Sequence, residues 1–375
     1  MRMRGGRGAL AAAVTATVAV AAGLWALRDI PASLGAAPSG ARARRVRRSP
    51  QFDGEAFRNP VPGAVIPHGT GKRVLRQLLF DDDHRAPRGT VPVVRPSTGP
   101  AGPLTTGGLH VTWMGHSTAL VEIEGRRVLF DPVWSDRCSP SALAGPRRVH
   151  PVPLPIERLP HIDAVVISHD HYDHLDRATV RTLTRTRSVP FLVPLGVGAH
   201  LERWGVPRSR IVELDWEEDA TVGGLRFTAT AARHFSGRAF ARNQTLWSSW
   251  VVAGQRRRVF YTGDSGYFDG YAEIGRAHGP FDLTLIQIGA YSAAWPDIHM
   301  TPEEAVEAHL DLRGDVLLPV HWGTFKLSVH PWSEPVDRLW TEAKARDVRL
   351  VVPRPGERIS ADDPPPVDGW WQTLA

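Results

Sequence analysis

The chain has 375 residues, of which 42% are hydrophobic and 22% are charged, the balance of an ordinary globular protein. Its formal net charge of +6 is concentrated in the first fifty residues, where nine arginines and one aspartate give +8 and leave −2 for residues 51–375. The body of the chain therefore gives no electrostatic reason to expect nucleic acid as a partner. The single cysteine, Cys138, excludes an intrachain disulfide.

Residues 9–27 form an apolar run without a charged side chain. A membrane-spanning helix needs about 20 such residues, whereas the apolar core of a secretory signal is shorter, roughly 7–15 residues. We predict that residues 1–48 are an N-terminal membrane anchor, or else a signal segment, followed by a basic linker. The protein would then be membrane-associated through this run. Arginines flank both of its ends, so they do not indicate which side of the membrane the body faces.

From residue 49 onward, predicted strands alternate with predicted helices. Alternating stretches rich in β-branched residues predict three strands, at 109–115, 118–125 and 126–131. A continuous apolar run at 162–168 predicts a strand that is buried on both faces. It leads directly into HDHYDH at 169–174, and Asp176 then caps a predicted helix. HDHYDH is therefore expected in a loop at the carboxyl end of a buried strand, where open α/β layers commonly place their sites.

The HDHYDH loop concentrates side chains that bind metal ions. His169 and His171 lie two positions apart and can point the same way, while Asp173 and His174 can turn toward a second point. One divalent ion takes about four nitrogen or oxygen ligands, so these four residues are too few for two ions. Further candidates each follow an apolar strand; they are His234, Asp264 and His321.

Each of these later residues also has a simpler interpretation. A single histidine after a strand, such as His234 or His321, is most often structural, and an aspartate before Ser-Gly, such as Asp264, is most often a turn residue. Asp170 is expected to be a solvated loop side chain. The HxHxDH pattern is more specific, and it favours a metal-binding role for the strand-end residues that follow it.

The ligand pattern resembles that of the metallo-β-lactamase superfamily. Longer motifs extend over about residues 49–375, the predicted catalytic domain, and include TWMGHST (112–118), LFDPVWSDRCSPSALAGPRR (129–148), IDAVVISHDHYDHLD (162–176), GDSGY (263–267), HMTPEEAVEAH (299–309) and HWGTF (321–325). In these motifs the chain resembles more closely the N-acylphosphatidylethanolamine-hydrolysing phospholipase D family and its bacterial relatives.

The resemblance implies an α/β fold, a four-layer αββα sandwich, with two zinc ions at one edge. Iron or manganese would suit the same ligands. The implied ligands are His169, His171 and His234 for the first ion, Asp173, His174 and His321 for the second, and Asp264 as the bridge. A hydroxide shared by the ions would attack a phosphodiester. The implied catalytic residues are Asp173, Asp264 and His299.

Three other residues are candidates for the surroundings of the metals. Asp131 would orient a ligand histidine, although a turn aspartate before Pro132 is an equally good interpretation. His116 would line the site, or else pack as a structural histidine. His299 precedes the helix start Thr-Pro-Glu-Glu and would reach the substrate or the leaving group.

The second half of the chain is rich in tryptophan, and these side chains bear on the substrate. Trp295, in a loop before His299, is expected to line an acyl groove. His309 is expected on the surface of a helix. The stretch 233–244 differs from the animal enzymes and would lie beside the metals, which leaves the choice of substrate open.

Three functions are compatible with these features. The first is a zinc phosphodiesterase of phospholipase D type, with a phospholipid substrate at a membrane surface and no nucleic acid partner. The second is a metal-dependent hydrolase of a small soluble substrate, such as a lactone or a sugar phosphate. The third is a membrane-tethered binding protein without activity. The first requires an apolar groove beside the metals, the second a small polar cavity, and the third a broken ligand set.

Overall fold

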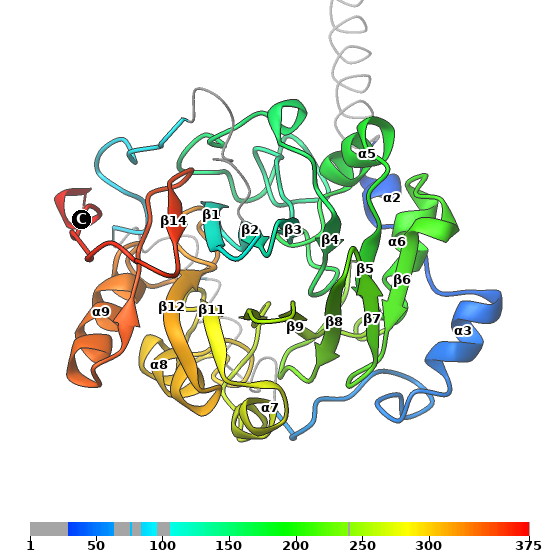
Figure 1. The fold of residues 1–375 in the computed structure, drawn as a ribbon. Helices are drawn as coiled ribbons and strands as arrows, with labels where there is room; N and C mark the ends of the chain where they lie inside the picture. The colour runs from blue at the N-terminus through cyan, green and yellow to red at the C-terminus, as the bar shows by residue number, and fades with distance from the viewer. Residues whose placement is uncertain (1–28, 64–75, 77–83, 96–105, 239–240, 375) are drawn as a thin grey trace, which may run out of the picture.

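The computed structural model describes residues 29–63, 76, 84–95, 106–238 and 241–374. Within them, two seven-stranded β-sheets lie face to face, and helices cover the outer side of each sheet (Figure 1). This arrangement confirms the predicted four-layer αββα sandwich.

The first sheet is mixed and has the order β14-β1-β2-β3-β4-β5-β6. The strands from β14 to β3 pair antiparallel, and those from β3 to β6 pair parallel. Its strands are β1 Leu109–Gly115, β2 Thr118–Ile123, β3 Arg126–Phe130, β4 Ala164–Val166, β5 Phe191–Pro194, β6 Ile211–Leu214 and β14 Arg358–Ser360. The first four confirm the predicted strands, with β4 shorter than the apolar run that predicts it.

The second sheet repeats this mixed pattern with the order β13-β12-β11-β10-β9-β8-β7. The strands from β13 to β10 pair parallel, and those from β10 to β7 pair antiparallel. Its strands are β7 Asp219–Val222, β8 Leu225–Thr230, β9 Ser249–Ala253, β10 Arg258–Tyr261, β11 Phe281–Gln287, β12 Gly314–Val320 and β13 Arg349–Leu350.

The helices complete two outer layers. The first sheet is covered by α5 Arg177–Thr186 and α6 Gly198–Arg203, and the second by α7 Gly270–His278, α8 Pro302–Asp311 and α9 Glu334–Ala345. Asp176 caps α5 by accepting from the Ala178 amide, and α8 begins with a capping box between Thr301 and Glu304. Both helix starts follow the sequence signals that predict them.

Side chains alternate between two hydrophobic cores along the strands of the first sheet. On β2, Val121 points into the core between the sheets, whereas Leu120 points into the layer beneath α5, where it joins Val180 and Leu183. Successive strand residues face opposite sides, so an entirely apolar strand has both faces covered. This double burial holds the strands, and the loops at their ends, in fixed positions.

Residues 29–48, which the sequence assigns to the basic linker, pack against the catalytic domain. They contain the short helices α2 Ile30–Ser33 and α3 Gly40–Val46. Arg42 on α3 forms ion pairs with Glu202 at 2.5 Å and Glu213 at 2.6 Å. Glutamates far along the chain thus hold Arg42, and with it this segment, against the catalytic domain.

The predicted location at a membrane requires correction. Among the residues that the structure describes, no helix is long and apolar enough to cross a membrane. Residues 9–27, on which the prediction rests, lie outside the described part of the chain.

His309 on α8 also differs from the sequence prediction. Its side chain is buried, and its Nδ1 atom lies 2.8 Å from Thr284 Oγ1 on β11. α8 lies against β11 and β12, so this position of the helix faces the sheet rather than solvent. The polar character of histidine is satisfied by the buried threonine, which the sequence pattern does not reveal.

Candidate metal centre

The structure brings all seven predicted ligand residues together at one edge of the sandwich. They lie in the loops that follow β4, β8, β10 and β12, and the turn between β1 and β2 adds His116. Parallel strands present their carboxyl ends at the same sheet edge, so residues far apart in the sequence converge there. The seven residues are His169, His171, Asp173, His174, His234, Asp264 and His321.

One group of four ligand-type residues contains three histidines and one aspartate. His169, His171, His234 and Asp264 each offer one atom, and these atoms all lie within 4.8 Å of one another. His169 Nε2 lies 2.9 Å from His171 Nδ1, and His234 Nε2 lies 3.3 Å from the same atom. Nitrogen atoms converging from three imidazole rings are the usual surroundings of a divalent transition metal.

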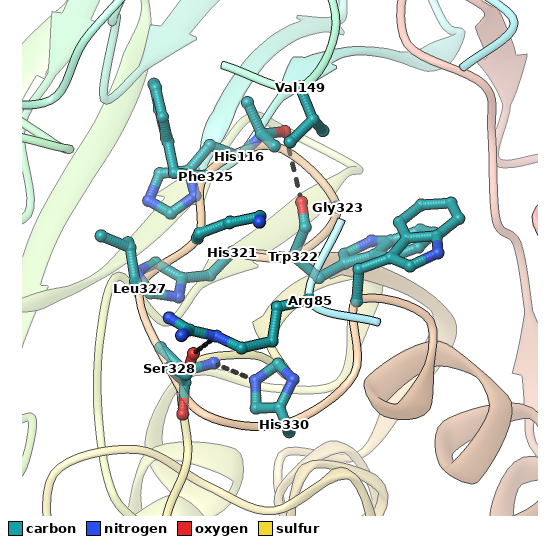
Figure 2. A pocket seen from close by; sticks show the side chains of 14 residues that line it. Arg85, His116, Val149, His321, Trp322, Gly323, Phe325, Leu327, Ser328 and His330 are labelled. Carbon is teal, nitrogen blue, oxygen red and sulfur yellow. Dashed lines mark hydrogen bonds between the residues drawn. The ribbon is translucent and has the colours of Figure 1, made fainter. Parts of the chain in front are cut away.

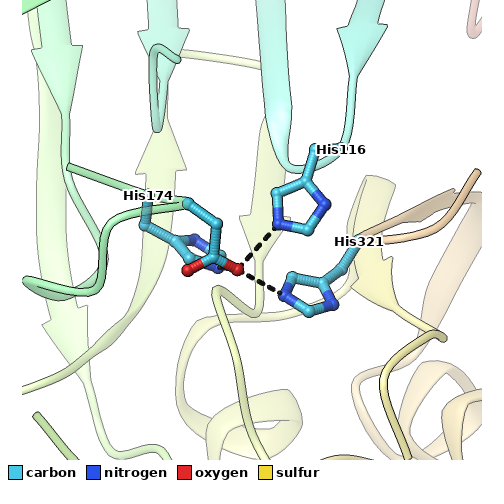
Figure 3. Close-up of side chains that lie close together, drawn as sticks. His116, His174 and His321 are labelled. Atoms are coloured by element: carbon cyan, nitrogen blue, oxygen red, sulfur yellow. Dashed lines mark hydrogen bonds and ion pairs between the residues drawn. The ribbon is translucent and has the colours of Figure 1, made fainter. Parts of the chain in front are cut away.

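A second group of ligand-type residues adjoins the first. One of its members is His116, which the sequence predicts to lie beside the metals rather than among their ligands. The group contains His116, Asp173, His174 and His321, with ligand atoms again within 4.8 Å of one another. The carboxylate of Asp173 lies between two of the rings, with Oδ2 2.9 Å from His116 Nε2 and 3.2 Å from His321 Nε2 (Figure 3). His116 therefore has the position of a further ligand rather than that of a packing residue.

Asp264 lies between the two groups. Its Oδ2 atom is 3.1 Å from Nε2 of both His174 and His321 in the second group. The same oxygen is 3.8 Å and 3.7 Å from Nε2 of His169 and His234 in the first group. One carboxylate that reaches four imidazoles in two groups has the position that a bridging ligand requires.

The donor atoms fit a pair of divalent ions. Each group offers four nitrogen or oxygen atoms, the number that zinc usually takes. Several of their buried polar atoms have no hydrogen-bond partner, which is costly unless an ion satisfies them. These atoms include His174 Nε2 and Asp264 Oδ1.

The electrostatics of the site also favour cations. Burial lowers the pKa of His169 and His234 well below the usual range, so both rings are neutral, the form that binds metal. Burial would raise the pKa of Asp264, but His174 and His321 hold it well below its usual range. Burial likewise opposes charge on His321, yet Asp264 and Asp173 raise its pKa to about 9. The carboxylates thus favour positive charge at this position, which a bound metal ion would supply.

Asp131 lies behind the second group and accepts hydrogen bonds from several donors. Its Oδ2 atom lies 2.6 Å from His174 Nδ1 and accepts from the Ser168 hydroxyl and the Tyr261 hydroxyl at 2.5 Å. Its Oδ1 atom accepts from the Ser168 amide at 2.7 Å. A carboxylate on Nδ1 fixes the tautomer that leaves Nε2 free for a metal. This contact is the one that the predicted orienting role requires.

The first group has its own supporting contacts. His234 Nδ1 lies 2.9 Å from the Ile298 carbonyl, and the Asn59 side chain accepts from the His234 amide at 2.8 Å. Sequence reasoning did not identify these partners, nor Ser168 and Tyr261. Ser168 directly precedes HDHYDH, so its position in the sequence could have indicated a supporting role. A main-chain carbonyl such as that of Ile298 leaves no sequence signal, because every residue has one.

Gly263, before Asp264, allows β10 to approach the metal loop closely. Its φ of +57° is unfavourable for a residue with a side chain, and a Cβ atom there would lie 2.5 Å from Ser168 Cβ. The contact brings the loop after β10 against the loop after β4, and with it Asp264 against the histidines.

Asp170 is buried in the metal loop, and the prediction of a solvated side chain is wrong. Its carboxylate accepts from the Gly237 amide at 2.7 Å and the Thr245 hydroxyl at 3.0 Å. His200 Nε2 lies 3.2 Å away, and the Ala36 amide donates to the other nitrogen of that ring. The loop is covered by segments distant in sequence, which supply donors that the local pattern cannot indicate.

An apolar pocket opens beside the ligand groups. Its volume is about 230 Å³, and Phe235, Trp295, Ile298 and Leu327 line it together with His299 and Asp264. Trp295 therefore borders the site, as the acyl-groove prediction requires, and the stretch 233–244 contributes Phe235. His299 lies with Asp264 and His321 in a third set of adjacent ligand-type residues.

A second pocket adjoins the same histidines from another side. Figure 2 shows His116 and His321 among its lining residues, with Phe325, Leu327 and the guanidinium of Arg85 on the same side. Arg85 Nε donates to the Ser328 carbonyl at 2.9 Å, which fixes the guanidinium in this pocket. Each pocket thus combines apolar side chains with a cation, Arg242 in the first and Arg85 in the second.

Comparison with known proteins agrees with this geometry. A family model for the beta-lactamase superfamily domain matches residues 126–322. A metallo hydrolase from Ignicoccus hospitalis has a similar structure, with a TM-score of 0.52 and 22% identity over 67% of this chain and 97% of that one. At this identity the likeness supports the fold alone. The chain belongs to the metallo-β-lactamase superfamily, and it is a metal-dependent hydrolase of that class.

Two relatives define its position within the superfamily. An uncharacterized protein of Mycobacterium tuberculosis is 49% identical over 366 residues, which cover 95% of this chain and 97% of that protein. The N-acyl-phosphatidylethanolamine-hydrolyzing phospholipase D 1 of Caenorhabditis elegans is 38% identical over 273 residues, which cover 68% of this chain and 77% of that protein. The chain thus resembles the phospholipase D enzymes that act on N-acylphosphatidylethanolamine.

Proposed function

We propose that the protein is a zinc-dependent phosphodiesterase of phospholipase D type that cleaves N-acylphosphatidylethanolamine-like phospholipids. Water would add to phosphorus as the bond from phosphorus to the head-group oxygen breaks, giving phosphatidic acid and an N-acylethanolamine. The observation that carries this proposal is the apolar pocket of about 230 Å³ that opens directly onto the two joined His/Asp groups. The resemblance to the Caenorhabditis elegans enzyme supports the same substrate class.

In this proposal the ligand residues hold two divalent ions in the groups described above. Such ions lower the pKa of water toward about 7 and neutralise the charge of a phosphodiester. The chain positions the other parts of the substrate. Phe235 and Trp295 provide an apolar wall for an acyl chain and exclude water, while Arg242 in the same pocket and Arg85 in the adjoining pocket bring positive charge.

The same pocket distinguishes the proposal from its alternatives. A hydrolase of small soluble substrates requires a compact polar cavity, whereas the wall beside His299 is largely apolar: it includes Phe235, Trp295, Ile298 and Leu327, with the cation Arg242 in the same pocket. A binding protein without activity would be expected to lack ligand residues, yet all seven predicted ligand residues converge. These observations support lipid hydrolysis.

The proposal is tested by identifying products with mass spectrometry. Purified protein is incubated with a panel of phospholipids that includes N-acylphosphatidylethanolamine, with and without a chelator. We expect phosphatidic acid and N-acylethanolamine from the N-acylated lipid, and none after chelation. Absence of phosphatidic acid from every lipid, or hydrolysis of a lactone in its place, contradicts the proposal.

The apolar wall is tested by Trp295→Ala, with Trp340→Ala on α9 as the matched control outside both pockets. We expect Trp295→Ala to reduce kcat/KM for the lipid by about tenfold or more, because a buried aromatic contact is lost. Turnover of a small soluble phosphodiester should change little. Equal losses on both substrates would assign Trp295 a structural role instead.

A further inference from the structure

A groove outside the metal centre carries an unusual concentration of arginine. It lies along α5, and Figure 1 shows α2 beside that helix. Its volume is about 500 Å³, a size typical of sites for small organic ligands. None of the metal-centre residues lines it, and residues 51–375 as a whole carry a net charge of −2. The positive charge is therefore a local feature of this surface.

Three arginines form one row on α5. Arg177, Arg181 and Arg185 are spaced four residues apart, which places them on the same side of the helix. The opposite side of α5 packs Val180 and Leu183 into the core. Because the apolar side fixes the orientation of the helix, the arginine row is held toward the groove.

The negative charges in the groove are already engaged. Asp29 pairs with Arg177 at 3.2 Å, and Asp136 pairs with Arg147 at 2.7 Å. Asp176 accepts from main-chain amides, including that of Ser135 at 3.0 Å. Neither Arg181 nor Arg185 has a carboxylate partner among the described residues, so both can bind an anion.

Arg238 adds a buried cation to the lining. It is 6% exposed, and its guanidinium donates only to main-chain carbonyls within the described part of the chain, those of Ser33, Asp170 and Leu175. Its guanidinium also stacks on the Tyr172 ring at 4.0 Å. Carbonyls orient an arginine without forming an ion pair with it, while Asp170 and Asp176 act on its charge from nearby, so Arg238 adds only part of its positive potential to the groove.

Hydroxyl groups from a neighbouring loop complete the lining. The loop that contributes Arg137 also contributes Ser135, Ser139 and Ser141. Planar guanidinium groups match phosphate oxygens in pairs, and serine hydroxyls donate to the oxygens that remain. Arginine rows with adjacent hydroxyls therefore suit a phosphate group better than a carboxylate.

We propose that this groove is a second, non-catalytic site that binds a phosphate-bearing ligand through Arg181 and Arg185. The site does not depend on the reaction at the metal centre. Its ligand is a phosphate ester, either soluble or carried on a lipid head group. The row on α5 and the hydroxyls of the 135–141 loop would hold the phosphate, and the remaining volume would hold the group attached to it.

Isothermal titration of full-length protein with glycerol 3-phosphate tests the site. The variant is R181A/R185A, and the control is R276A, an exposed arginine on α7 that lies outside the groove. We expect at least about tenfold weaker binding in the double variant, because each charge-assisted hydrogen bond to phosphate contributes substantially. The control should bind like the wild type, and added salt should weaken binding. Equal affinity in all three proteins overturns the proposal.

Sedimentation with vesicles distinguishes the two sources of the phosphate. Phosphatidylcholine vesicles with phosphatidic acid are compared with vesicles of phosphatidylcholine alone. Binding to the first kind that is lost in R181A/R185A assigns a lipid head group, whereas arginine-dependent binding of glycerol 3-phosphate alone assigns a soluble ester. If the double substitution changes neither measurement, the groove is not a phosphate site.

Discussion

Asp264 is the single residue that both halves of the metal centre share. Its Oδ2 atom reaches two histidines of each group, and its Oδ1 atom has no hydrogen-bond partner among the described residues. An amide at this position keeps the shape of the side chain but replaces one oxygen by a donor and removes the negative charge. The two groups would then lose the carboxylate that joins them.

We expect Asp264→Asn to lower bound metal and to reduce activity by about a thousandfold or more, with the fold retained. Metal content by elemental analysis and circular dichroism measure the two effects separately. The matched control is Asp315→Asn, at an exposed aspartate of β12 that pairs with Arg349. Near-normal metal content and rate in Asp264→Asn would show that the carboxylate does not bridge.

His309 predicts a pH dependence of stability that is independent of the metals. Burial lowers its pKa from 6.5 to about 4, so the unfolded chain binds a proton in this range before the folded chain does. Its contribution to stability is complete above pH 6.5 and is lost as the pH falls toward 4, by about 2–3 kcal/mol. Urea unfolding of chelated wild type and His309→Gln across this range measures the difference. Parallel curves for the two proteins would contradict it.

At the scale of elements, the loops at the carboxyl ends of the strands place the ligands, and segments from elsewhere hold those loops. Asp170 links the metal loop to Gly237 and Thr245, and Arg238 donates to the Asp170 carbonyl at 2.6 Å. Residues 29–48 add an outer layer, since Arg238 also donates to the Ser33 carbonyl. The N-terminal segment is therefore part of the support of the site.

Arg42 provides the test of that segment. We expect Arg42→Ala to destabilise the protein by about 2–4 kcal/mol, because it leaves the nearly buried Glu213 without its cation. Urea unfolding measures this loss. Arg44, on the same helix α3, forms no ion pair with a described residue, so Arg44→Ala is the control, and a change within about 0.5 kcal/mol is expected. Similar values for both variants would mean that Arg42 does not fasten the segment.

At the scale of the whole molecule, the metal centre joins the two sheets. Loops of the first sheet contribute His116, His169 and His174. Loops of the second sheet contribute His234, Asp264 and His321. Ions bound by both sets connect the halves of the sandwich. Ions that bind the folded state and not the unfolded chain raise stability in proportion to the logarithm of their concentration over Kd.

Removal of the metals should therefore lower Tm by on the order of 10 °C, and zinc should restore it. Scanning calorimetry with chelator, and then after zinc is added back, measures both steps. The Asp264→Asn variant should show a smaller shift, since it has lost the shared ligand. An unchanged Tm in chelated wild type would mean that no ion links the sheets.

The sequence by itself determined the candidate ligands, and its resemblance to the metallo-β-lactamase superfamily implied the αββα class. Apolar runs that end in His or Asp specify buried strands and the residues at their ends, because both signals are local in the chain. HDHYDH, with strand-end residues at 234, 264 and 321, was sufficient to predict which side chains converge. The capping signals at the starts of α5 and α8 also lie within a few consecutive residues, so the sequence was enough to predict them.

Only the tertiary structure decided what surrounds those ligands. Several features depend on partners more than twenty residues away in the sequence. They are the place of His116 among the ligands, the burial of Asp170 and His309, and the packing of residues 29–48. A polar side chain has the same sequence signature whether water or a distant donor satisfies it. Folding supplies the donor, so the supporting contacts and the arginine groove became visible only when the segments met.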